Sequence, residues 1–396
     1  MTMIAIVLAM LCTRSTQPPS EADPAAMAEV GSGTRTTANA AWWGFDSSDA
    51  TDALQSAVDS GAKTILVPYM GADWNVTPIT LCDDIELILE PGVVVCAKKG
   101  EFKGKGDSLF SATNAHDVTI SGYGATLRMQ KDDYQSEDYE PAEWRSTLDF
   151  MGCSNIRVSG LKLESSGGDG IYLGSTEEQN YCKDVTIRDV TCRNLHRQGI
   201  SVVCAVDLLI ENCVMSDTGG TSPEAGIDFE PNDAGEHMEN CVVRNCRMLD
   251  NAGAGILVYL KALTGKSTPV SLRFERCLVQ GGKDSGIGMG ALRDEGPQGN
   301  IEFDHCTVEN SPGGGLYLYD KSPDAARVRF VGCAWKGVGV ENGKPAKHSP
   351  LLLHRRRDAI AERLGGIDFD NCYVVDEFDR PALQVDTDDE VTLTDV

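Results

Sequence analysis

The feature that most constrains the fold is a glycine followed by an aliphatic residue, recurring at nearly constant intervals. The pairs begin at Gly170, Gly199, Gly226, Gly255, Gly286 and Gly315, separated by steps of 29, 27, 29, 31 and 29 residues. Such a period indicates one supersecondary unit stacked on copies of itself. Each unit holds two or three short alternating apolar runs bounded by Asn, Asp and Gly, which is typical of strands and turns. The chain is therefore predicted to be all-β, a parallel β-solenoid of at least eight coils.

Alternation within each unit predicts which side chains face the core. Successive strand residues point to opposite faces, so the apolar residue after each glycine is assigned to the interior. These interior positions are Ile171, Ile200, Ile227, Ile256, Ile287 and Leu316. In the third copy, the outward positions become Asp228 and Glu230, which we expect to face solvent on a surface shared with tyrosines and an arginine.

The N-terminal residues 1–41 are expected to be a signal peptide or a disordered leader, without packed structure. Met3–Cys12 is apolar but too short to span a bilayer, and the following stretch is polar and rich in proline. The expected location is secreted or periplasmic. Residues 42–396 are assigned to one elongated β-helix domain, because solenoids grow by adding repeats.

A short amphipathic helix is expected over Ala50–Gly61, with Asp49 as a possible N-cap, covering the open end of the stack. Thr64–Pro68 would be the first strand. Two longer segments interrupt the repeat, namely Lys131–Trp144 and Gly337–Leu364. The second contains His354 and three arginines, and its end permits a short helix over residues 358–364. Both segments are long enough to line a groove.

Fourteen cysteines in 396 residues would suggest disulfides in a small secreted protein. Six of them instead occupy one position of the repeat, after an alternating run: Cys213, Cys246, Cys277, Cys306, Cys333 and Cys372. Leu161 and Val190 hold the equivalent position earlier, so it is a small buried apolar site. We expect reduced thiols stacked on one sheet inside the core, and no zinc site, because the CxxC spacing is absent.

The formal net charge of −25 argues against nucleic acid or anionic membranes as partners. It favours a protein that can bind cations. No sequence pattern indicates a nucleotide, haem or nicotinamide site, so no cofactor is required, while calcium binding remains open. The oligomeric state cannot be predicted.

The candidate site is built around the acidic copy of the repeat. The predicted catalytic residues are Asp228, Glu230 and Asp169. The predicted substrate-binding residues are Arg197, Tyr172, Gln198, His196, Tyr259, Lys261, Asp233 and Tyr317. Asp228 and Glu230 would place two carboxyl groups about 5 to 9 Å apart, as glycoside hydrolysis requires. Structural roles in turns remain equally open for Asp169 and are favoured for His196 and Gln198.

The run Ser165–Gly174, the stretches Arg197–Ser201 and Gly226–Asn232, and the coil repeat together resemble the pectin-lyase-like superfamily. That resemblance implies a right-handed parallel β-helix with a helical cap, and action on polysaccharides. The motifs of polygalacturonase-like hydrolases are only approximated, by Gly167–Asp169, and the pectate lyases have no specific match here.

Three functions follow from the residues and the resemblance. The leading one is a glycoside hydrolase with paired carboxylates. The second is a lyase or C5-epimerase of uronic-acid polymers, with Arg197 or Tyr172 transferring a proton and the acids holding calcium or neutralising the uronate. The third is a carbohydrate-binding or adhesive β-helix without catalysis.

Overall fold

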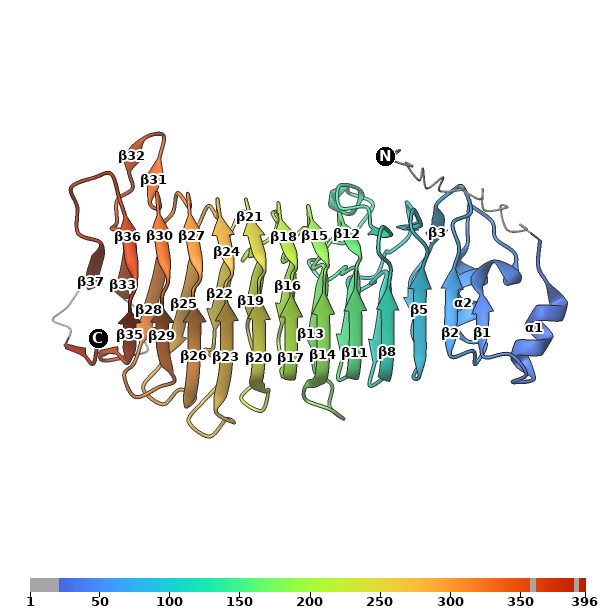
Figure 1. Cartoon of the computed structure of the whole chain (residues 1–396), viewed down its shortest axis with the longest axis horizontal. Helices are drawn as coiled ribbons and strands as arrows, with labels where there is room; N and C mark the ends of the chain where they lie inside the picture. The colour runs from blue at the N-terminus through green and yellow to red at the C-terminus, as the bar shows by residue number, and fades with distance from the viewer. Residues whose placement is uncertain (1–20, 357–360, 388–391) are drawn as a thin grey trace, which may run out of the picture.

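The computed structural model describes residues 21–356, 361–387 and 392–396. Within this part of the chain, three long parallel sheets of 12, 11 and 11 strands wind around one core. Apart from β1, which extends one sheet alone, each coil contributes one strand to each sheet, and the coils follow one another along the long axis of the molecule (Figure 1). The predicted β-solenoid, with more than eight coils, is confirmed.

Sheet A, the 12-stranded sheet, comprises β1 (Thr37–Asn39), β2 (Thr64–Val67), β5 (Ile85–Leu89), β8 (His116–Ser121), β11 (Ser154–Ser159), β14 (Cys182–Arg188), β17 (Ala205–Glu211), β20 (Met238–Arg244), β23 (Val270–Glu275), β26 (Gly299–Asp304), β29 (Arg327–Val331) and β35 (Ile367–Asp370). Sheet B comprises β3 (Trp74–Val76), β6 (Val94–Ala97), β9 (Thr126–Arg128), β12 (Lys162–Glu164), β15 (Thr191–Arg193), β18 (Val214–Ser216), β21 (Arg247–Leu249), β24 (Leu278–Gln280), β27 (Thr307–Glu309), β30 (Ala334–Lys336) and β36 (Tyr373–Val375).

Sheet C comprises β4 (Ile79–Thr80), β7 (Phe110–Thr113), β10 (Leu148–Met151), β13 (Ile171–Gly174), β16 (Ile200–Val202), β19 (Ile227–Phe229), β22 (Ile256–Tyr259), β25 (Ile287–Leu292), β28 (Leu316–Lys321), β33 (Leu351–Arg355) and β37 (Leu383–Thr387). Two small pairs complete the strands: an antiparallel hairpin of β31 (Val340–Glu341) and β32 (Lys344–Pro345), and a parallel pair of β34 (Leu364–Gly365) and β38 (Leu393–Thr394).

The interior of the solenoid is a set of stacks of like side chains. Ile171, Ile200, Ile227, Ile256 and Ile287 are register partners on sheet C, and each is 0% exposed. Sheet A contributes an aromatic stack in which Phe274, Phe303 and Phe330 lie with ring centroids 4.6 and 4.9 Å apart. One coil alone could not bury these faces, so each coil is stabilised by its neighbours.

A residue in the left-handed backbone conformation marks the corner between sheets A and B. Asn212, Asn245 and His305 have φ of 57°, 54° and 52°, a region that Asn tolerates better than most residues. The next residue in each coil is a buried cysteine. The predicted thiol position is thus internal for five of the six cysteines, and Cys372 is half-buried. The position lies in this corner and not on a sheet, because the left-handed residue ends the strand of sheet A.

The corner thiols form no disulfide within the described part of the chain, and their sulfur atoms lie close to backbone carbonyls of the preceding coil. The Cys277 Sγ lies 3.5 Å from the Val243 carbonyl oxygen, and the Cys306 Sγ lies 3.3 Å from that of Phe274. We expect all six corner cysteines to be reduced, because parallel side chains packed in this way do not easily reach the disulfide dihedral near 90°. Mass spectrometry after alkylation under denaturing, non-reducing conditions checks this. Failure of most of the six to react would contradict it.

The N-terminal end is more ordered than the sequence predicts. The expectation of no packed structure through Ala41 is wrong for residues 24–41. Helix α1 (Pro24–Gly31) is capped by the Asp23 side chain, and β1 adds a strand before the predicted first strand. The 3₁₀ helix η1 (Ala40–Trp43) links β1 to the cap. Residues 1–20, including the apolar run, lie outside the described part of the chain.

Helix α2 (Thr51–Val58) confirms the predicted cap. Its buried face, which includes Leu54 and Val58, packs on the first coil. Asp49 accepts a hydrogen bond from the Thr51 backbone amide, although Ala50 holds the N-cap position. None of the helices in the described part of the chain is long and apolar enough to cross a bilayer.

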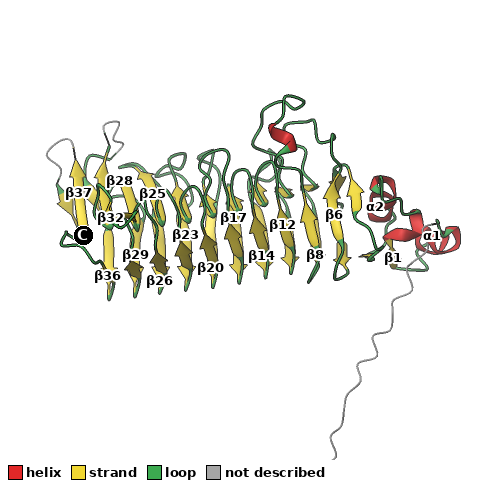
Figure 2. Cartoon of the chain, turned by 90° about the horizontal axis from the view of Figure 1, so that it is seen from above, coloured by secondary structure: helices red, strands yellow, loops and turns green. Residues whose placement is uncertain are grey.

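The predicted insertion Lys131–Trp144 is a loop containing the 3₁₀ helix η2 (Asp133–Gln135). It stands out from the stacked strands on the side where β25 and β28 lie (Figure 2). The second segment, Gly337–Leu364, contains the β31–β32 hairpin and then rejoins sheet C as β33. The short helix expected at its end is wrong for residues 361–364, where Leu364 begins β34; residues 357–360 are outside the described part.

Candidate functional site

A cleft of about 720 Å³ runs over the outer face of sheet C. Its walls come from the coils of β16 through β33. The lining residues are Arg197, Ser222, Pro223, Glu224, Glu230, Ala252, Gly253, Ala254, Leu257, Tyr259, Asp284, Gly288, Tyr317, Tyr319 and Arg356. Gly288 widens the cleft, because a Leu or Tyr occupies the outward position on each adjacent strand. The cleft therefore combines carboxylates, guanidinium groups and aromatic rings.

Four of the predicted site residues line this cleft, namely Arg197, Glu230, Tyr259 and Tyr317. Five others do not line it and are buried or half-buried nearby: Asp169, Tyr172, His196, Gln198 and Asp228. The last two, Asp233 and Lys261, are exposed and are not among the lining residues. Asp233 accepts a hydrogen bond from the Gly235 amide, so its role in the structure is to shape a turn.

Arg197 connects the carboxyl groups of the site. Its Nη1 lies 3.5 Å from Asp169 Oδ2, and its Nη2 lies 3.7 Å from Glu230 Oε2. The side chain is 15% exposed, and its Nε has no hydrogen-bond partner. Burial alone would lower the pKa of Arg197, but the carboxylates around it, led by Asp169 and Asp228, raise it. A positively charged group thus stands between two acids at the end of the cleft.

Asp228 is 0% exposed, so the expectation that it faces solvent is wrong. It does stand on the outer face of sheet C, beside Ser201 and Leu257 in the neighbouring coils. Side chains from the preceding coil cover it, and Gln198 Nε2 donates to Asp228 Oδ2 at 2.8 Å. Oδ1 has no hydrogen-bond partner. Burial raises the pKa of Asp228 well above its usual range, and the repulsion of Glu230 and Asp169 adds to this against the opposing effect of Arg197.

Asp169 is the second fully buried carboxyl group. Its Oδ1 accepts a hydrogen bond from the Gln198 backbone amide at 2.9 Å. Burial raises the pKa of Asp169 to about 7, although Arg197 and the Gln198 amide act in the opposite direction. A carboxyl group of this kind exchanges its proton near neutral pH.

Gln198 joins three parts of the site. Besides its contacts to Asp169 and Asp228, its Oε1 accepts from the Ala225 amide at 2.7 Å. His196, two residues earlier, contacts the following coil, with Nε2 2.9 Å from Thr221 Oγ1, so this hydrogen bond is not the local turn contact that was expected. Burial lowers the pKa of His196. Gln198 therefore positions the two buried carboxyl groups, whereas His196 links its own loop to the next coil.

Replacing Gln198 by leucine is expected to lower the free energy of unfolding by about 1 to 3 kcal/mol, because it leaves the buried Ala225 amide and the Asp228 carboxyl without partners. Urea unfolding followed by circular dichroism measures this. Lys261→Ala, at an exposed position, is the matched control and should change stability by less than about 0.5 kcal/mol. Equal stability of the two variants would contradict the positioning role.

Two acids of the site were missed by the sequence analysis. Asp149 on β10 pairs in register with Tyr172, so it belongs to the outward row that leads through Tyr172 and Ser201 to Asp228. Burial raises the pKa of Asp149 to about 6, and its Oδ1 has no hydrogen-bond partner. Glu143, in the insertion, raises the pKa of both Asp169 and Arg197. The alternation of Leu148–Phe150 could have revealed Asp149, but this coil lacks the Gly-Ile pair.

These raised carboxyl pKa values predict how stability depends on pH. A carboxyl that ionises near pH 4 in the unfolded chain but near 6 or 7 in the fold favours the folded state at low pH. Its contribution to the free energy of unfolding falls as the pH rises from about 4 to about 7, and it stays constant above about pH 7. We expect Asp149→Asn to flatten this fall between about pH 4 and 6, with exposed Asp233→Asn as the control. Urea unfolding across the range measures it, and an unchanged slope for Asp149→Asn would contradict the assignment.

The far end of the cleft is aromatic and basic. The rings of Tyr317 and Tyr319 stack with centroids 5.1 Å apart, and the Arg356 guanidinium lies 5.0 Å from the Tyr319 ring centre. The Tyr317 hydroxyl is 2.9 Å from His354 Nδ1. Gly290 permits this arrangement, since a Cβ at that position would lie 2.3 Å from the Tyr319 ring.

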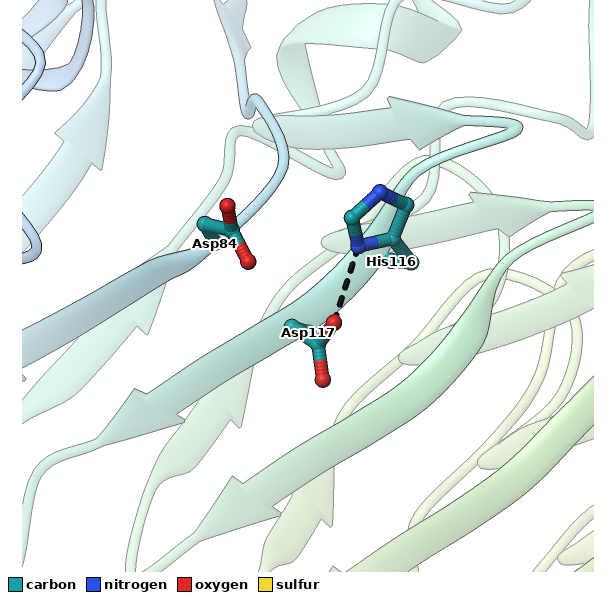
Figure 3. A group of neighbouring side chains, drawn as sticks. All are labelled: Asp84, His116 and Asp117. Atoms are coloured by element: carbon teal, nitrogen blue, oxygen red, sulfur yellow. Dashed lines mark hydrogen bonds and ion pairs between the residues drawn. The ribbon is translucent and has the colours of Figure 1, made fainter.

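A group of metal-ligand residue types lies elsewhere, just before β5 and at the start of β8. Ligand atoms of Asp84, His116 and Asp117 lie within 4.8 Å of one another (Figure 3). All three residues are exposed, and His116 Nδ1 is 2.9 Å from Asp117 Oδ2. Asp117 and Asp83 raise the pKa of His116. The two carboxylates stabilise the protonated form of His116, which is already paired with Asp117. A metal ion would therefore have to displace the proton from the imidazole before binding.

Comparison with known proteins agrees with this architecture. Residues 146–334 match the family model described as the right handed beta helix region. The uncharacterized protein YclG of Bacillus subtilis strain 168 is 26% identical over 51% of this chain and 39% of its own length. The present chain thus spans well under half of that relative.

Two solved structures share the fold at low identity. The family 28 exopolygalacturonase of Yersinia enterocolitica superposes with a TM-score of 0.60 at 12% identity, covering 89% of this chain and 77% of that one. An iota-carrageenase in complex with iota-carrageenan fragments gives 0.57 at 11% identity, covering 90% and 92%. The fold is a right-handed parallel β-helix, which is the fold that the resemblance implied.

Proposed function

We propose that this protein is a carbohydrate-active enzyme that hydrolyses glycosidic bonds in a polysaccharide or oligosaccharide. The observation that carries the proposal is the contrast between two neighbouring carboxyl groups, Asp228 on β19 and Glu230 just after it. Glu230 lines the cleft beside Arg197, whereas Asp228 is fully buried with a raised pKa. Two acids in such different environments are what glycoside hydrolysis requires.

The two carboxyl groups would have different roles. Asp228, held protonated by burial, would donate a proton to the leaving oxygen, and Glu230 would act as the base or nucleophile. Alternate residues of a strand lie about 6.6 Å apart, a separation that fits both inversion and retention. Because Asp228 is covered, the substrate must displace a neighbouring side chain to reach it. Leu257, which adjoins Asp228 and lines the cleft, is in a position to move.

The remaining cleft residues suit the binding of sugar rings. Tyr259, Tyr317 and Tyr319 offer flat faces and hydroxyl groups, and Arg197 and Arg356 offer cations for a uronate or sulfate. The likeness in fold to a polygalacturonase and a carrageenase supports this class of substrate. Asp169 would act through Arg197, as a positioning residue.

The alternative of a lyase or epimerase is less well supported. It needs a neutral base, but the carboxylates raise the pKa of Arg197 and burial raises that of Tyr172, so neither is easily deprotonated. Calcium could serve such a reaction by binding the acids, but it would have to compete with Arg197 for Asp169 and Glu230. A binding protein without catalysis is the third candidate, and the unpartnered Asp228 oxygen has no role in it.

A panel of acidic and neutral polysaccharides, assayed with and without a calcium chelator, separates these functions. We expect new reducing ends, no rise in ultraviolet absorbance and no loss of activity with the chelator. A conjugated double bond absorbing in the ultraviolet would instead indicate a lyase. Binding without either product would indicate an adhesive or binding protein.

A further inference from the structure

The insertion Lys131–Trp144 has no role in the function proposed so far, yet it is firmly anchored. Arg145, just after it, is 0% exposed, and its Nε donates to the Phe102 carbonyl at 2.9 Å. Its guanidinium lies 5.5 and 5.4 Å from the ring centres of Tyr134 and Tyr139. These two rings are themselves buried and packed edge to face. The loop is thus held in one position by a buried cation and two aromatic rings.

The end of this loop lies directly against the candidate site. Residues 143–145 run beside Gly167 and Gly168, where a Cβ on Gly168 would be 2.7 Å from the Glu143 carbonyl oxygen. Only glycine permits this approach. The next residue is Asp169, and the Gly168 carbonyl accepts a hydrogen bond from the Arg197 amide. Trp144 is therefore anchored within the backbone that borders the Asp169–Arg197 pair.

Trp144 is 50% exposed, in contrast to the other four tryptophans. Trp74 and Trp335 are buried, and Trp42 and Trp43 pack partly on the core. An indole left half in water on an anchored backbone retains apolar area that a ligand can cover. Its backbone adjoins Gly168, the residue before Asp169, and an indole suits a ring with one apolar face and polar edges, as in a sugar.

The aromatic groups then lie on both sides of the carboxyl cluster. Trp144 adjoins the coil of β13, and the tyrosines stand on the coils of β22 and β28. Arg197 and Glu230 belong to the coils of β16 and β19 between them. With about 4.8 Å per coil, the distance from β13 to β28 along the axis is roughly 24 Å, long enough for several sugar rings.

We propose that Trp144 is a sugar-binding platform on the N-terminal side of the acids, so that the saccharide binds along the solenoid axis on both sides of the bond that is cleaved. Such an enzyme acts within a polymer and not only at its end. This inference rests on the proposed function for its cleavage part. The binding part can be tested without turnover.

The binding test uses Glu230→Gln, which is expected to be inactive, titrated with the polysaccharides of the panel and their oligomers. We expect the tryptophan emission to change on binding, and Trp144→Ala in the same background to abolish the change and weaken binding by about tenfold. Trp144→Phe should retain most of the affinity. Tyr373→Ala, at a residue that is 52% exposed on the last coil, is the matched control. The proposal is overturned if the Glu230→Gln protein binds every saccharide equally well with and without Trp144→Ala. It is also overturned if neither protein binds any saccharide.

The activity test separates this inference from the proposed function. In active protein, Trp144→Ala should raise KM for long chains by about tenfold while leaving kcat for the shortest cleaved oligomer unchanged. The wild type should lower the viscosity of a polymer early, before many reducing ends form. If the wild type cleaves polymers only from the end, the inference fails while the hydrolase stands. If binding requires Trp144 but no saccharide is cleaved, the platform stands and the hydrolase fails.

Discussion

Replacing Asp228 by asparagine or Glu230 by glutamine is expected to reduce turnover by a factor on the order of 10² to 10⁴, the usual contribution of a positioned acid or base. Neither substitution should unfold the protein. Asparagine resembles the protonated carboxyl that burial favours at Asp228, and it can still accept from Gln198 Nε2. Glu230 has a side chain that is 30% exposed, so glutamine removes a charge without opening a cavity. Initial rates of reducing-end formation, together with circular dichroism, measure both effects.

Arg197→Ala is the decisive comparison for these variants. In the hydrolase, Arg197 binds substrate and positions the acids, so its loss should weaken activity less than loss of either acid. If Arg197→Ala abolishes activity while both acid variants keep most of theirs, the carboxyl pair is not catalytic. The lyase or epimerase would then take its place.

Replacing Phe303 by alanine is expected to lower the free energy of unfolding by about 3 to 5 kcal/mol. Phe303 is 0% exposed and stacks between Phe274 and Phe330, so truncation leaves a cavity that two coils share. The surrounding coils can collapse only partly, because their register is fixed on all three sheets. The urea midpoint followed by circular dichroism measures the loss.

Tyr373→Ala again serves as the control for this substitution, since a half-exposed ring should contribute less than about 0.5 kcal/mol. If the urea midpoint of Phe303→Ala lies as close to that of the wild type as the midpoint of Tyr373→Ala does, the shared aromatic core is contradicted. Phe303→Leu should lie between the two, because it refills most of the volume.

Most of the fold could be predicted from the sequence, because stacking requires apolar side chains at the same inward positions in every coil. The Gly-Ile spacing predicted the interior of sheet C. The alternating runs before the cysteines did not show that the residue before each thiol ends the strand of sheet A, so the thiols were assigned to a sheet and not to the corner. The first strand and helix α1 were not predicted, because residues 24–41 have no copy elsewhere in the chain. Their order comes from packing on the cap and pairing with β2, which a local pattern does not contain.

The site was only partly predictable, for a related reason. Alternation correctly assigned Asp228 and Glu230 to the outer face, but it carries no information on what the adjacent coil places over that face. Gln198 and Arg197 decide that Asp228 is buried while Glu230 stays in the cleft. Glu143 reaches the site through an insertion whose path depends on the two glycines at 167 and 168.

The central claim is that water is added across a glycosidic bond in this cleft, and labelled water tests it most directly. The protein is incubated with a polysaccharide that it cleaves, in water enriched in the heavy oxygen isotope. The masses of the products are then measured by mass spectrometry. We predict one heavy oxygen atom per bond broken, present with the wild type and absent with Glu230→Gln. Products that carry no heavy oxygen, or labelled products that form equally well without Glu230, would contradict it.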